Sequence, residues 1–376
     1  MKYKILHLTS SLKVGGAETL LVDLLRSIDK NEFENYVIYF HSGPNIERIE
    51  SLGIKTFQIK GLFCKYDPIF FIRLFLLIKK LRPDCIHSLL WAANFSGTLI
   101  AFLLRIPIVC ALHLASNFES KNKNNLIRAI LDKFTFTFAN KLVAVSDTVL
   151  NELNNSFKIS AEKIEVIKNG IDVNYIKLKA SEVKKTKSDF NLNNDHFIIG
   201  SVGRFIPRKR HDFLIDCFAL LAKKYSNMRL MLIGSGELEN YLRIKTIELK
   251  IQEKVMFIYS SEAYSFYPFF DVFALTSEQE GLSIALLEAM SFGVPSVITS
   301  PNALHEVIET DKNGMVVEID NKDEFNSAIE KIYLDKDFAH HLSVNATKTA
   351  LMNYNLHNMT DAYCKIFKDN ITKINY

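Results

Sequence analysis

Residues 277–290 read SEQEGLSIALLEAM, which predicts the end of a strand, a polar loop and then a helix. The loop ends at Gly281, and Ser283 falls in the first turn of the expected helix. Backbone N–H groups at a helix start, together with the positive end of the helix dipole, form a ready site for an anion. We therefore expect this loop and helix start to bind a phosphate group.

Outward from this stretch, short β-rich apolar runs alternate with helical patterns along most of the chain. Such runs occur at residues 4–8, 36–40, 56–59, 85–89, 108–113, 142–146 and 164–168 in the first half, and at 197–202, 230–233, 255–259, 272–275, 296–299 and 315–317 in the second. Strands that are apolar on both faces and separated by helices indicate a parallel sheet covered by helices. Because the pattern runs twice, we predict an α/β chain with two Rossmann-like domains.

The domain boundaries follow from shifts in composition. We predict an N-terminal Rossmann-like domain at 1–176, a polar, Lys-rich linker at 177–195, a C-terminal Rossmann-like domain at 196–355 and a helical return to the first domain at 356–376. Ligands of open α/β sheets bind beyond the carboxyl ends of the strands. Two such sheets facing each other would form a cleft between them.

Length and composition exclude several classes of protein. The chain has 376 residues, 48% of them hydrophobic and 23% charged, which is typical of two or three folded domains and excludes a mainly disordered chain. A net charge of only +4 argues against a nucleic-acid partner. Five cysteines without a C-x-x-C pair suggest neither a zinc site nor disulfides. Because we find no signal peptide and no run of ~20 apolar residues, we expect a cytoplasmic protein without a membrane span.

A basic motif, Val202–Lys209 with the sequence VGRFIPRK, follows the first strand of the second domain. Gly203 lets the backbone turn close to a ligand, and Arg204 and Lys209 can converge on one anion from a strand end and a helix start. Together the two cations would neutralise a diphosphate. The alternative is a solvated basic loop, which a run of basic residues alone would favour.

Two glycine pairs also follow strands. Gly15 and Gly16 lie between the first strand and the first helix, where they allow a ligand to approach the backbone closely. Gly234 and Gly236 end a strand of the second domain, but the complete G-x-G-x-x-G dinucleotide fingerprint is absent there. Both pairs have a structural alternative, because glycines in strand-to-helix loops often only supply turn geometry.

The segments Glu280-Gly-Leu, Glu288-Ala-Met and Gly293-Val-Pro-Ser-Val, in this order, resemble the hallmark of family 4 glycosyltransferases. These are retaining sugar-nucleotide transferases of the GT-B fold, and the resemblance covers nearly the whole chain. It implies catalytic roles for Glu280, at the hydroxyls of the donor sugar, and for Arg204 and Lys209, at the diphosphate. It also implies that Glu288 binds the ribose, because a carboxylate can accept hydrogen bonds from two vicinal hydroxyls.

The same resemblance assigns further residues to the substrates. The substrate-binding residues are Gly15, Gly16, Gly203, Gly234, Gly236, Gly281 and Leu282, with the pair at 234 and 236 beside the nucleoside. His113 ends a strand at which family members often carry a histidine that reaches the donor sugar, which makes it a catalytic candidate. A lone histidine on an apolar strand is more often a buried structural residue, and Leu114 departs from the small residue usual in the family.

The implied activity is that of a hexosyltransferase. Its donor would be a nucleoside diphosphate sugar of the UDP or GDP type, and its acceptor a glycan or lipid-linked glycan, most often in bacterial surface polysaccharide biosynthesis. We expect no metal or other cofactor, because two cations are available for the diphosphate. Three alternatives remain open: a nucleotide-sugar epimerase of the same fold, a non-catalytic glycan- or nucleotide-binding protein, and an oxidoreductase, which the missing fingerprint disfavours.

Two apolar and basic stretches bear on where the acceptor binds. Residues 69–81 are apolar almost all round, and we expect a buried crossover helix there. Residues 117–141 combine Lys and Arg with the run FTFTF at 134–138, a mixture typical of helices at membrane surfaces. For this second stretch, peripheral contact with the inner face of the cell membrane and a solvated loop both remain open.

Overall fold

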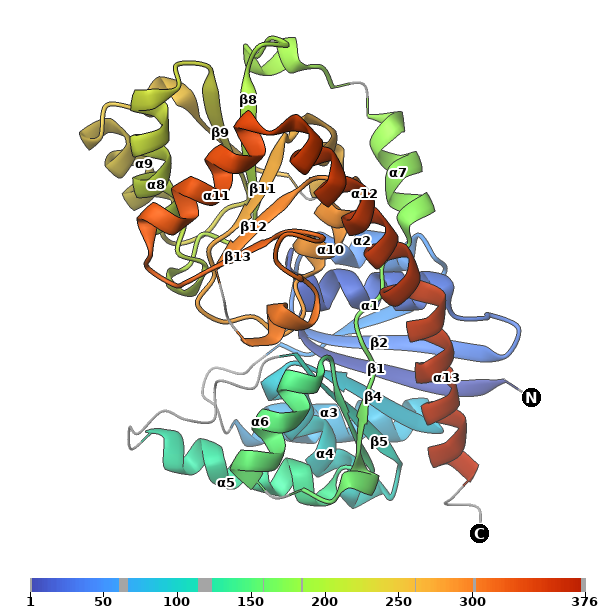
Figure 1. Cartoon of the computed structure of the whole chain (residues 1–376). Helices are drawn as coiled ribbons and strands as arrows, with labels where there is room; N and C mark the ends of the chain where they lie inside the picture. Colours follow the sequence, from blue (N-terminus) through green and yellow to red (C-terminus); the bar gives the residue numbers. More distant parts are fainter. Residues whose placement is uncertain are drawn as a thin grey trace. The chain divides into compact units, whose positions relative to one another are not determined.

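The computed structural model describes residues 2–60, 67–113, 124–157, 159–183, 185–260, 262–299 and 302–372 (Figure 1). The chain divides into two compact units. Unit 1 consists of Met1–Gly170 and Leu356–Tyr376, and unit 2 consists of Ile171–Asn355. The C-terminal segment therefore returns to the first unit, as the sequence predicted.

Unit 1 is built on a parallel sheet with the strand order β3-β2-β1-β4-β5-β6-β7 among the described residues. Its strands are β1 (Tyr3–Ser11), β2 (Phe33–His41), β3 (Lys55–Gln58), β4 (Cys85–Leu89), β5 (Ile108–Leu112), β6 (Lys141–Ala144) and β7 (Ile164–Val166). Each run that predicted a strand in this half forms one. The order reverses between β1 and β4, because β2 and β3 extend the sheet on one side of β1 and the later strands on the other.

Helices cover both faces of this sheet (Figure 1). They are α1 (Gly16–Ser27), α2 (Asn45–Glu50), α3 (Pro68–Leu81), α4 (Trp91–Leu104), α5 (Asn124–Phe138), α6 (Asp147–Phe157) and α13 (Leu356–Thr372). α4 lies between α3 and α5 and contacts both, while α1 contacts α2 and α13. α3, α4 and α5 thus form one layer, and α1, α2 and α13 lie on the opposite face.

An apolar stripe holds α13 to unit 1. Met359, Tyr363 and Phe367 follow one another at intervals of four residues, which places them on one face of the helix, and all three are buried. The rings of Tyr363 and Phe367 pack 5.0 and 5.5 Å from the ring of His87 in β4. Burying a side chain of this kind contributes about 1.5–3 kcal/mol, so the stripe accounts for the docking of α13 on this sheet.

Unit 2 repeats the architecture with the strand order β10-β9-β8-β11-β12-β13 among the described residues. Its strands are β8 (Phe197–Val202), β9 (Met228–Ile233), β10 (Val255–Ile258), β11 (Val272–Leu275), β12 (Ser296–Thr299) and β13 (Met315–Val317), all parallel. The predicted strands of the second half are confirmed. Here the order reverses between β8 and β11.

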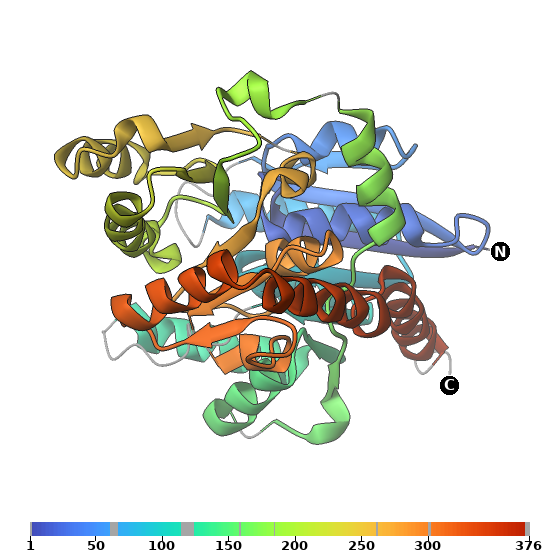
Figure 2. The same cartoon turned by 45° about the horizontal axis from the view of Figure 1, so that its top comes forward.

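The helices of unit 2 are α7 (Val173–Glu182), α8 (His211–Lys224), α9 (Glu239–Glu248), α10 (Ile284–Ser291), α11 (Lys322–Leu334) and α12 (Lys336–Asn353), seen from a second direction in Figure 2. α8 contacts α9 and α11, and α10 contacts α12. Fully buried Phe218 and Phe325 belong to the core between these helices and the sheet. Residues 177–195, expected as a linker, contain the second half of α7 and a short 3-10 helix at Lys187–Phe190.

Residues 69–81 form the expected crossover helix, but the expectation that this helix is buried is wrong for one of its sides. Phe70, Leu74 and Ile78 of α3 are fully buried, but the opposite side of the helix exposes apolar residues to 58% each: Ile69, Ile72 and Leu76. α3 covers the sheet with only one face, since a single helix layer leaves its outer side uncovered. Among the described residues, no helix combines the length and the apolar composition needed to cross a membrane.

Candidate active site

The sequence motifs of unit 2 meet at one edge of its sheet. The strand order reverses between β8 and β11, which pair directly, and open sheets bind ligands at the carboxyl edge of such a reversal. β8 leads into the loop 203–210 and β11 into the loop 276–283. The topology therefore brings together the basic motif and the acidic motif, which lie far apart in the sequence.

Hydrogen bonds fix these two loops to each other. The Thr276 hydroxyl donates to the backbone carbonyl oxygens of Lys209 and Arg210, each at 3.0 Å. The backbone N–H of Glu278 donates to the carbonyl oxygen of Arg208 at 2.9 Å. Because the backbones themselves are joined, the side chains on the two loops have a defined separation.

Glu280 lies at the centre of a cluster of donors. The Lys209 ammonium donates to Oε1 of this carboxylate, and so does the Ser277 hydroxyl at 2.7 Å. A guanidinium nitrogen of Arg208 lies 4.0 Å from Oε2, and the Glu280 side chain is only 9% exposed. Burial alone would raise the pKa of this carboxyl, but the charge and hydrogen bond of Lys209, the Ser277 hydroxyl and the charge of Arg208 outweigh burial and hold the pKa below its ordinary value of 4.5. Glu280 is therefore an ionised, oriented carboxylate at neutral pH.

Two predicted catalytic residues, Lys209 and Glu280, are thus in direct contact. Arg204, the other predicted catalytic residue of unit 2, is exposed on the same loop as Lys209, and no carboxylate among the described residues forms an ion pair with it. Cations bind phosphate oxygens through charge-assisted hydrogen bonds. An exposed cation on the same loop as a lysine held by a carboxylate suits the binding of an additional anion.

Arg208 of the basic motif and Arg210, the residue that follows it, hold the loops in place. Arg210 donates to the carboxylates of Glu278 and Asp320, both at 2.6 Å. Arg208 donates to the carbonyl oxygen of Gln279 at 2.9 Å. These contacts join the loop after β8 to the loop after β11 and to the segment after β13.

The predicted helix start is present one residue later than the sequence pattern suggested. α10 begins at Ile284, and Ser283 is its N-cap residue, whose hydroxyl accepts from the Leu286 N–H at 3.4 Å. Gly281 and Leu282 lie buried in the loop just before it. The N–H groups of the first turn of α10 remain the predicted site for an anion.

Glu288, half-buried on α10, contacts a tyrosine that the sequence analysis missed. Tyr267 Oη lies 2.8 Å from Glu288 Oε2 and 3.1 Å from the carbonyl oxygen of Ala285. Burial, reinforced by the charge of Glu288, raises the pKa of the Tyr267 phenol well above its ordinary value, so the hydroxyl keeps its proton and donates it. The sequence shows only an aromatic residue shortly before β11 at this position, and that residue type does not predict a contact with Glu288.

Three of the four glycines predicted to bind substrate in unit 2 differ in what surrounds them. A Cβ added to Gly234 would lie 2.0 Å from the carbonyl oxygen of Gly203, and its φ of +148° also favours glycine. A Cβ on Gly236 would lie 2.4 Å from the carbonyl oxygen of Phe205. A Cβ on Gly203 would meet nothing closer than Lys209 Cε, at 3.7 Å. Backbone packing thus requires glycine at 234 and 236, but not at 203.

The remaining predicted residues belong to unit 1. Gly15 is the N-cap of α1 and Gly16 its first residue, and a Cβ on Gly15 would lie 2.4 Å from Glu18 Oε2. The Glu18 carboxylate therefore lies over this helix start and complements its dipole. His113 follows β5, and its buried Nε2 has no hydrogen-bond partner among the described residues. Burial lowers the pKa of His113 to about 4, so it is neutral at physiological pH. Leu114 lies outside the described residues.

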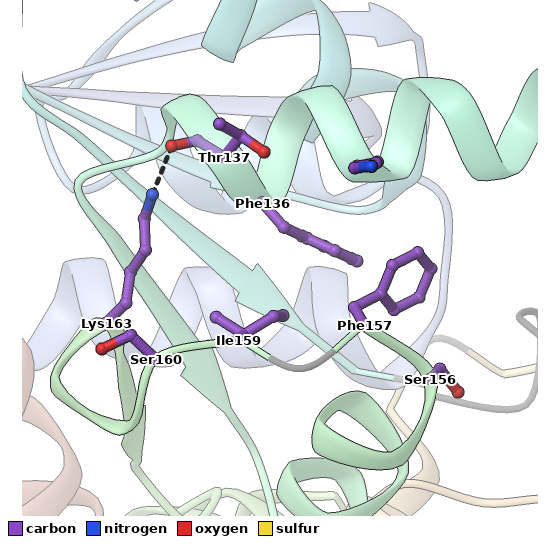
Figure 3. A pocket seen from close by; sticks show the side chains of 8 residues that line it. Phe136, Thr137, Ser156, Phe157, Ile159, Ser160 and Lys163 are labelled. Atoms are coloured by element: carbon purple, nitrogen blue, oxygen red, sulfur yellow. Dashed lines mark hydrogen bonds between the residues drawn. The ribbon is translucent and has the colours of Figure 1, made fainter.

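A cavity of about 400 Å³ lies elsewhere in unit 1 (Figure 3). Residues of α5, α6 and the segment that follows line it: Lys133, Phe136, Thr137, Ser156, Phe157, Ile159, Ser160 and Lys163. The rings of Phe136 and Phe157 meet edge to face at 4.9 Å, and the Lys163 ammonium donates to the carbonyl oxygen of Thr137. The described lining contains two lysines and no carboxylate, and none of the predicted site residues.

Comparison with known proteins identifies the family. Residues 182–349 match the family model of the glycosyl transferases group 1, and residues 14–175 match that of glycosyltransferase family 4. The chain belongs to the family 4, group 1 glycosyltransferases. This transferase is therefore an enzyme of the class that the sequence motifs implied, and the epimerase, oxidoreductase and non-catalytic alternatives are set aside.

Relatives of the transferase match it over most of their length. The N-acetylgalactosamine-N,N'-diacetylbacillosaminyl-diphospho-undecaprenol 4-alpha-N-acetylgalactosaminyltransferase of Campylobacter jejuni is 27% identical over 360 residues, 90% of this chain and 92% of that protein. The UDP-Gal:alpha-D-GlcNAc-diphosphoundecaprenol alpha-1,3-galactosyltransferase of Escherichia coli is 22% identical over 348 residues, 89% of each chain. The crystal structure of HepE of Anabaena with UDP and glucose superposes with a TM-score of 0.85 at 21% identity, covering 97% of this chain and 99% of that one. The transferase has the predicted GT-B fold.

Proposed function

We propose that this transferase moves a hexose residue from a UDP- or GDP-type nucleoside diphosphate sugar to a hydroxyl of a glycan or lipid-linked glycan, with retention at the anomeric carbon. The observation that carries the proposal is the ionised Glu280, held by Lys209 at the strand reversal of unit 2, with the exposed Arg204 on the same loop as Lys209. Two similar proteins support the same substrate classes, since the Escherichia coli relative is named for UDP-Gal and a diphosphoundecaprenol acceptor, and HepE was solved with UDP and glucose. Bacterial surface polysaccharide biosynthesis is the proposed setting.

The side chains of the site would act mainly through electrostatics. Arg204, Lys209 and the N–H groups at the start of α10 would stabilise the negative charge that develops as the bond to the diphosphate breaks. Lys209 already contacts Glu280, so its ammonium would bridge the carboxylate and a phosphate oxygen. The charged Glu280 would accept a hydrogen bond from a hydroxyl of the donor sugar. We propose that no metal takes part, because these cations neutralise the leaving group.

The bond changes of the proposed reaction balance without a further reactant. The bond between the anomeric carbon and the diphosphate oxygen breaks, and the acceptor oxygen bonds to the same face of that carbon. The acceptor proton passes to an oxygen of the leaving diphosphate. Glu288 would hold the ribose. Five further residues of unit 2 would line the donor site there: Gly203, Gly234, Gly236, Gly281 and Leu282. Three residues of unit 1 are proposed to bind substrate as well: Gly15, Gly16 and His113.

We also propose that unit 1 contacts the inner face of the cell membrane, where a lipid-linked acceptor would be available. The outer side of the α3–α5 layer carries eight exposed residues, here called the apolar face: Ile69, Ile72, Leu76, Phe102, Leu103, Ile127, Ile130 and Phe138. Exposed cations accompany them: Arg73, Lys79, Lys80, Arg105 and Lys133. Apolar surface with adjacent cations favours binding to anionic lipids. Residues 117–123 of the stretch predicted to contact the membrane lie outside the described residues.

A transfer assay tests the proposed chemistry. Lys209→Ala and Glu280→Gln should each lower kcat/KM by about 100-fold or more. The first removes a positive charge that stabilises the leaving diphosphate, and the second removes the negative charge that holds Lys209 in place. Release of the nucleoside diphosphate should depend on the acceptor. Thermal shift with a panel of nucleoside diphosphates and their sugars should identify the donor, since a ligand at 100 times its Kd adds about 2.7 kcal/mol of stability.

Matched controls come from an ion pair elsewhere in unit 2. Lys224 of α8 pairs with Glu330 of α11 at 2.9 Å, so Lys224→Ala and Glu330→Gln make the same chemical changes away from the proposed site. Both controls should retain turnover within about twofold. Near-wild-type turnover of Lys209→Ala or Glu280→Gln with the true donor and acceptor would refute the proposed site.

A further inference from the structure

We propose that Tyr267 is a positioning residue that makes the donor site selective for a ribose with its hydroxyls, by orienting Glu288. This inference rests on the proposed function, in which the Glu288 carboxylate binds the ribose. Tyr267 is fully buried and would act through Glu288 rather than on the ligand. Its role follows from three observations: its hydrogen bonds, the packing of its ring and the position of Glu288.

The Tyr267 hydroxyl joins Glu288 to its own helix. Oη lies 2.8 Å from Glu288 Oε2 and 3.1 Å from the carbonyl oxygen of Ala285, one turn earlier in α10. Residues three apart on a helix lie on the same side, so one hydroxyl can reach both. The contact holds the carboxylate in one orientation relative to the backbone of α10.

The ring of Tyr267 is itself immobilised by aromatic neighbours. It stacks on Phe292 at 5.6 Å with an interplanar angle of 21°. Phe270 meets it edge to face at 5.6 Å, and Phe273 of β11 lies 6.0 Å away. Since the ring is packed on several sides, the hydroxyl cannot swing away to find another partner. Tyr267 therefore provides Glu288 with a fixed donor from the protein interior.

A fixed donor matters because a glutamate side chain otherwise distributes over several rotamers. To bind vicinal hydroxyls, the carboxylate must present its oxygens in one orientation, and fixing that orientation before binding reduces the entropy lost on binding. Glu288 is half-buried, so part of this residue remains accessible while Tyr267 holds Oε2. The ribose is remote from the reacting bond, and we expect Tyr267 to affect donor affinity far more than the chemical step.

The test measures ribose selectivity in the full-length protein by calorimetric titration with UDP and GDP and with their 2′,3′-dideoxy analogues. For the diphosphate that binds, Tyr267→Phe should raise the Kd about tenfold, while the Kd of its dideoxy analogue stays within about twofold of wild type. In transfer assays the donor KM should rise with kcat within about twofold. A merely structural role would weaken both ligands equally.

Tyr333→Phe is the matched control. The Tyr333 hydroxyl donates to Asn227 Oδ1 at 3.2 Å, a contact that involves none of the predicted site residues, and its removal should leave the binding of both ligands unaffected. In a Glu288→Ala background, Tyr267→Phe should cause no further loss of ribose selectivity, because the two residues act as one unit. If Tyr267→Phe does not fold, Glu288→Asp replaces it, since the shorter side chain withdraws the carboxylate from the Tyr267 hydroxyl.

The outcomes separate this inference from the proposed function. If Glu288→Ala leaves the affinity for the ribonucleoside diphosphate unchanged, the ribose assignment in the proposed function is wrong. If Glu288→Ala weakens binding but Tyr267→Phe and Glu288→Asp keep full ribose selectivity, only the positioning role of Tyr267 is refuted. Equal losses for the ribo and dideoxy ligands in Tyr267→Phe would also overturn it.

Discussion

At the scale of single residues, Gly203 and Gly234 lie close together but are glycines for different reasons. At Gly234, a side chain would collide with the Gly203 carbonyl oxygen, so the fold itself demands glycine. At Gly203, a Cβ would make only ordinary contacts, the nearest at 3.7 Å to Lys209. A glycine that packing does not require, placed between the strand end and two cations, indicates that space is needed for a ligand.

This difference makes Gly203→Ala a selective probe of the donor site. We expect it to change the free energy of unfolding by no more than about 1 kcal/mol and to weaken nucleoside diphosphate binding at least tenfold, because the added methyl group occupies the ligand's approach. Urea unfolding and calorimetric titration measure the two quantities. Gly234→Ala should instead destabilise the protein by about 3 kcal/mol or more. Unchanged binding by a folded Gly203→Ala protein would contradict the proposed phosphate approach at this loop.

The residue types at the site could be predicted, but their pairing could not. The sequence indicated that Lys209 and Glu280 both contact the donor, one at the diphosphate and the other at the sugar. The structure also joins them to each other, which gives Glu280 its lowered pKa. Such an ion pair depends on where two loops lie in space, and no spacing along the chain encodes it.

At the scale of elements, the helices of unit 1 show that the pattern of apolar residues can predict a helix without predicting which of its sides is buried. The pattern of residues 69–81 correctly indicated a helix between two strands, but not that one of its apolar sides faces outward. Apolar residues almost all round a helix give little preference for one face, so the packing of α3 beside α4 determines which side is buried. The exposed side of α3 adds to that of α5 and gives the apolar face its extent.

Membrane contact can be tested on α5 with a matched pair of double variants. Ile127→Gln/Ile130→Gln removes two residues of the apolar face, exposed to 51% and 59%, and should reduce binding to vesicles of anionic phospholipid about tenfold in co-sedimentation. Because both residues are already exposed, the folded protein should lose little stability.

The control has the same spacing and chemistry in unit 2. Ile244 and Ile247 of α9 are exposed to 55% and 60%, so Ile244→Gln/Ile247→Gln removes equivalent apolar surface away from the apolar face. It should leave vesicle binding unchanged. Equal vesicle binding by the α5 variant and the wild type would exclude this part of the apolar face as a membrane contact.

At the scale of the whole molecule, the two units differ in how the chain builds them. Unit 2 is a continuous segment, Ile171–Asn355, whereas unit 1 needs both the first part of the chain and α13. The residues proposed to bind the diphosphate and the ribose, Arg204, Lys209 and Glu288, all belong to unit 2. Unit 2 should therefore fold and bind nucleotide by itself.

The fragment 171–355 tests this expectation directly. It should unfold cooperatively and bind the nucleoside diphosphate with a Kd within about tenfold of the full chain, yet transfer no sugar, because His113 and the rest of unit 1 are missing. The fragment 1–170 lacks α13 and should be unstable, since the side chains that cover His87 are removed. A folded 171–355 fragment that fails to bind the diphosphate would refute the assignment of the diphosphate site to unit 2.

The sequence by itself determined the α/β class, the positions of the strands, the return of the last helix and the residue types of the candidate site. These features depend on local periodicity and on short motifs, which a linear chain displays directly. Only the tertiary structure decided that Lys209 contacts Glu280, that Tyr267 holds Glu288, that packing requires Gly234 but not Gly203, and which side of α3 is exposed. Each of these depends on the distance between atoms far apart in the sequence, and that distance is set by how strands and helices pack.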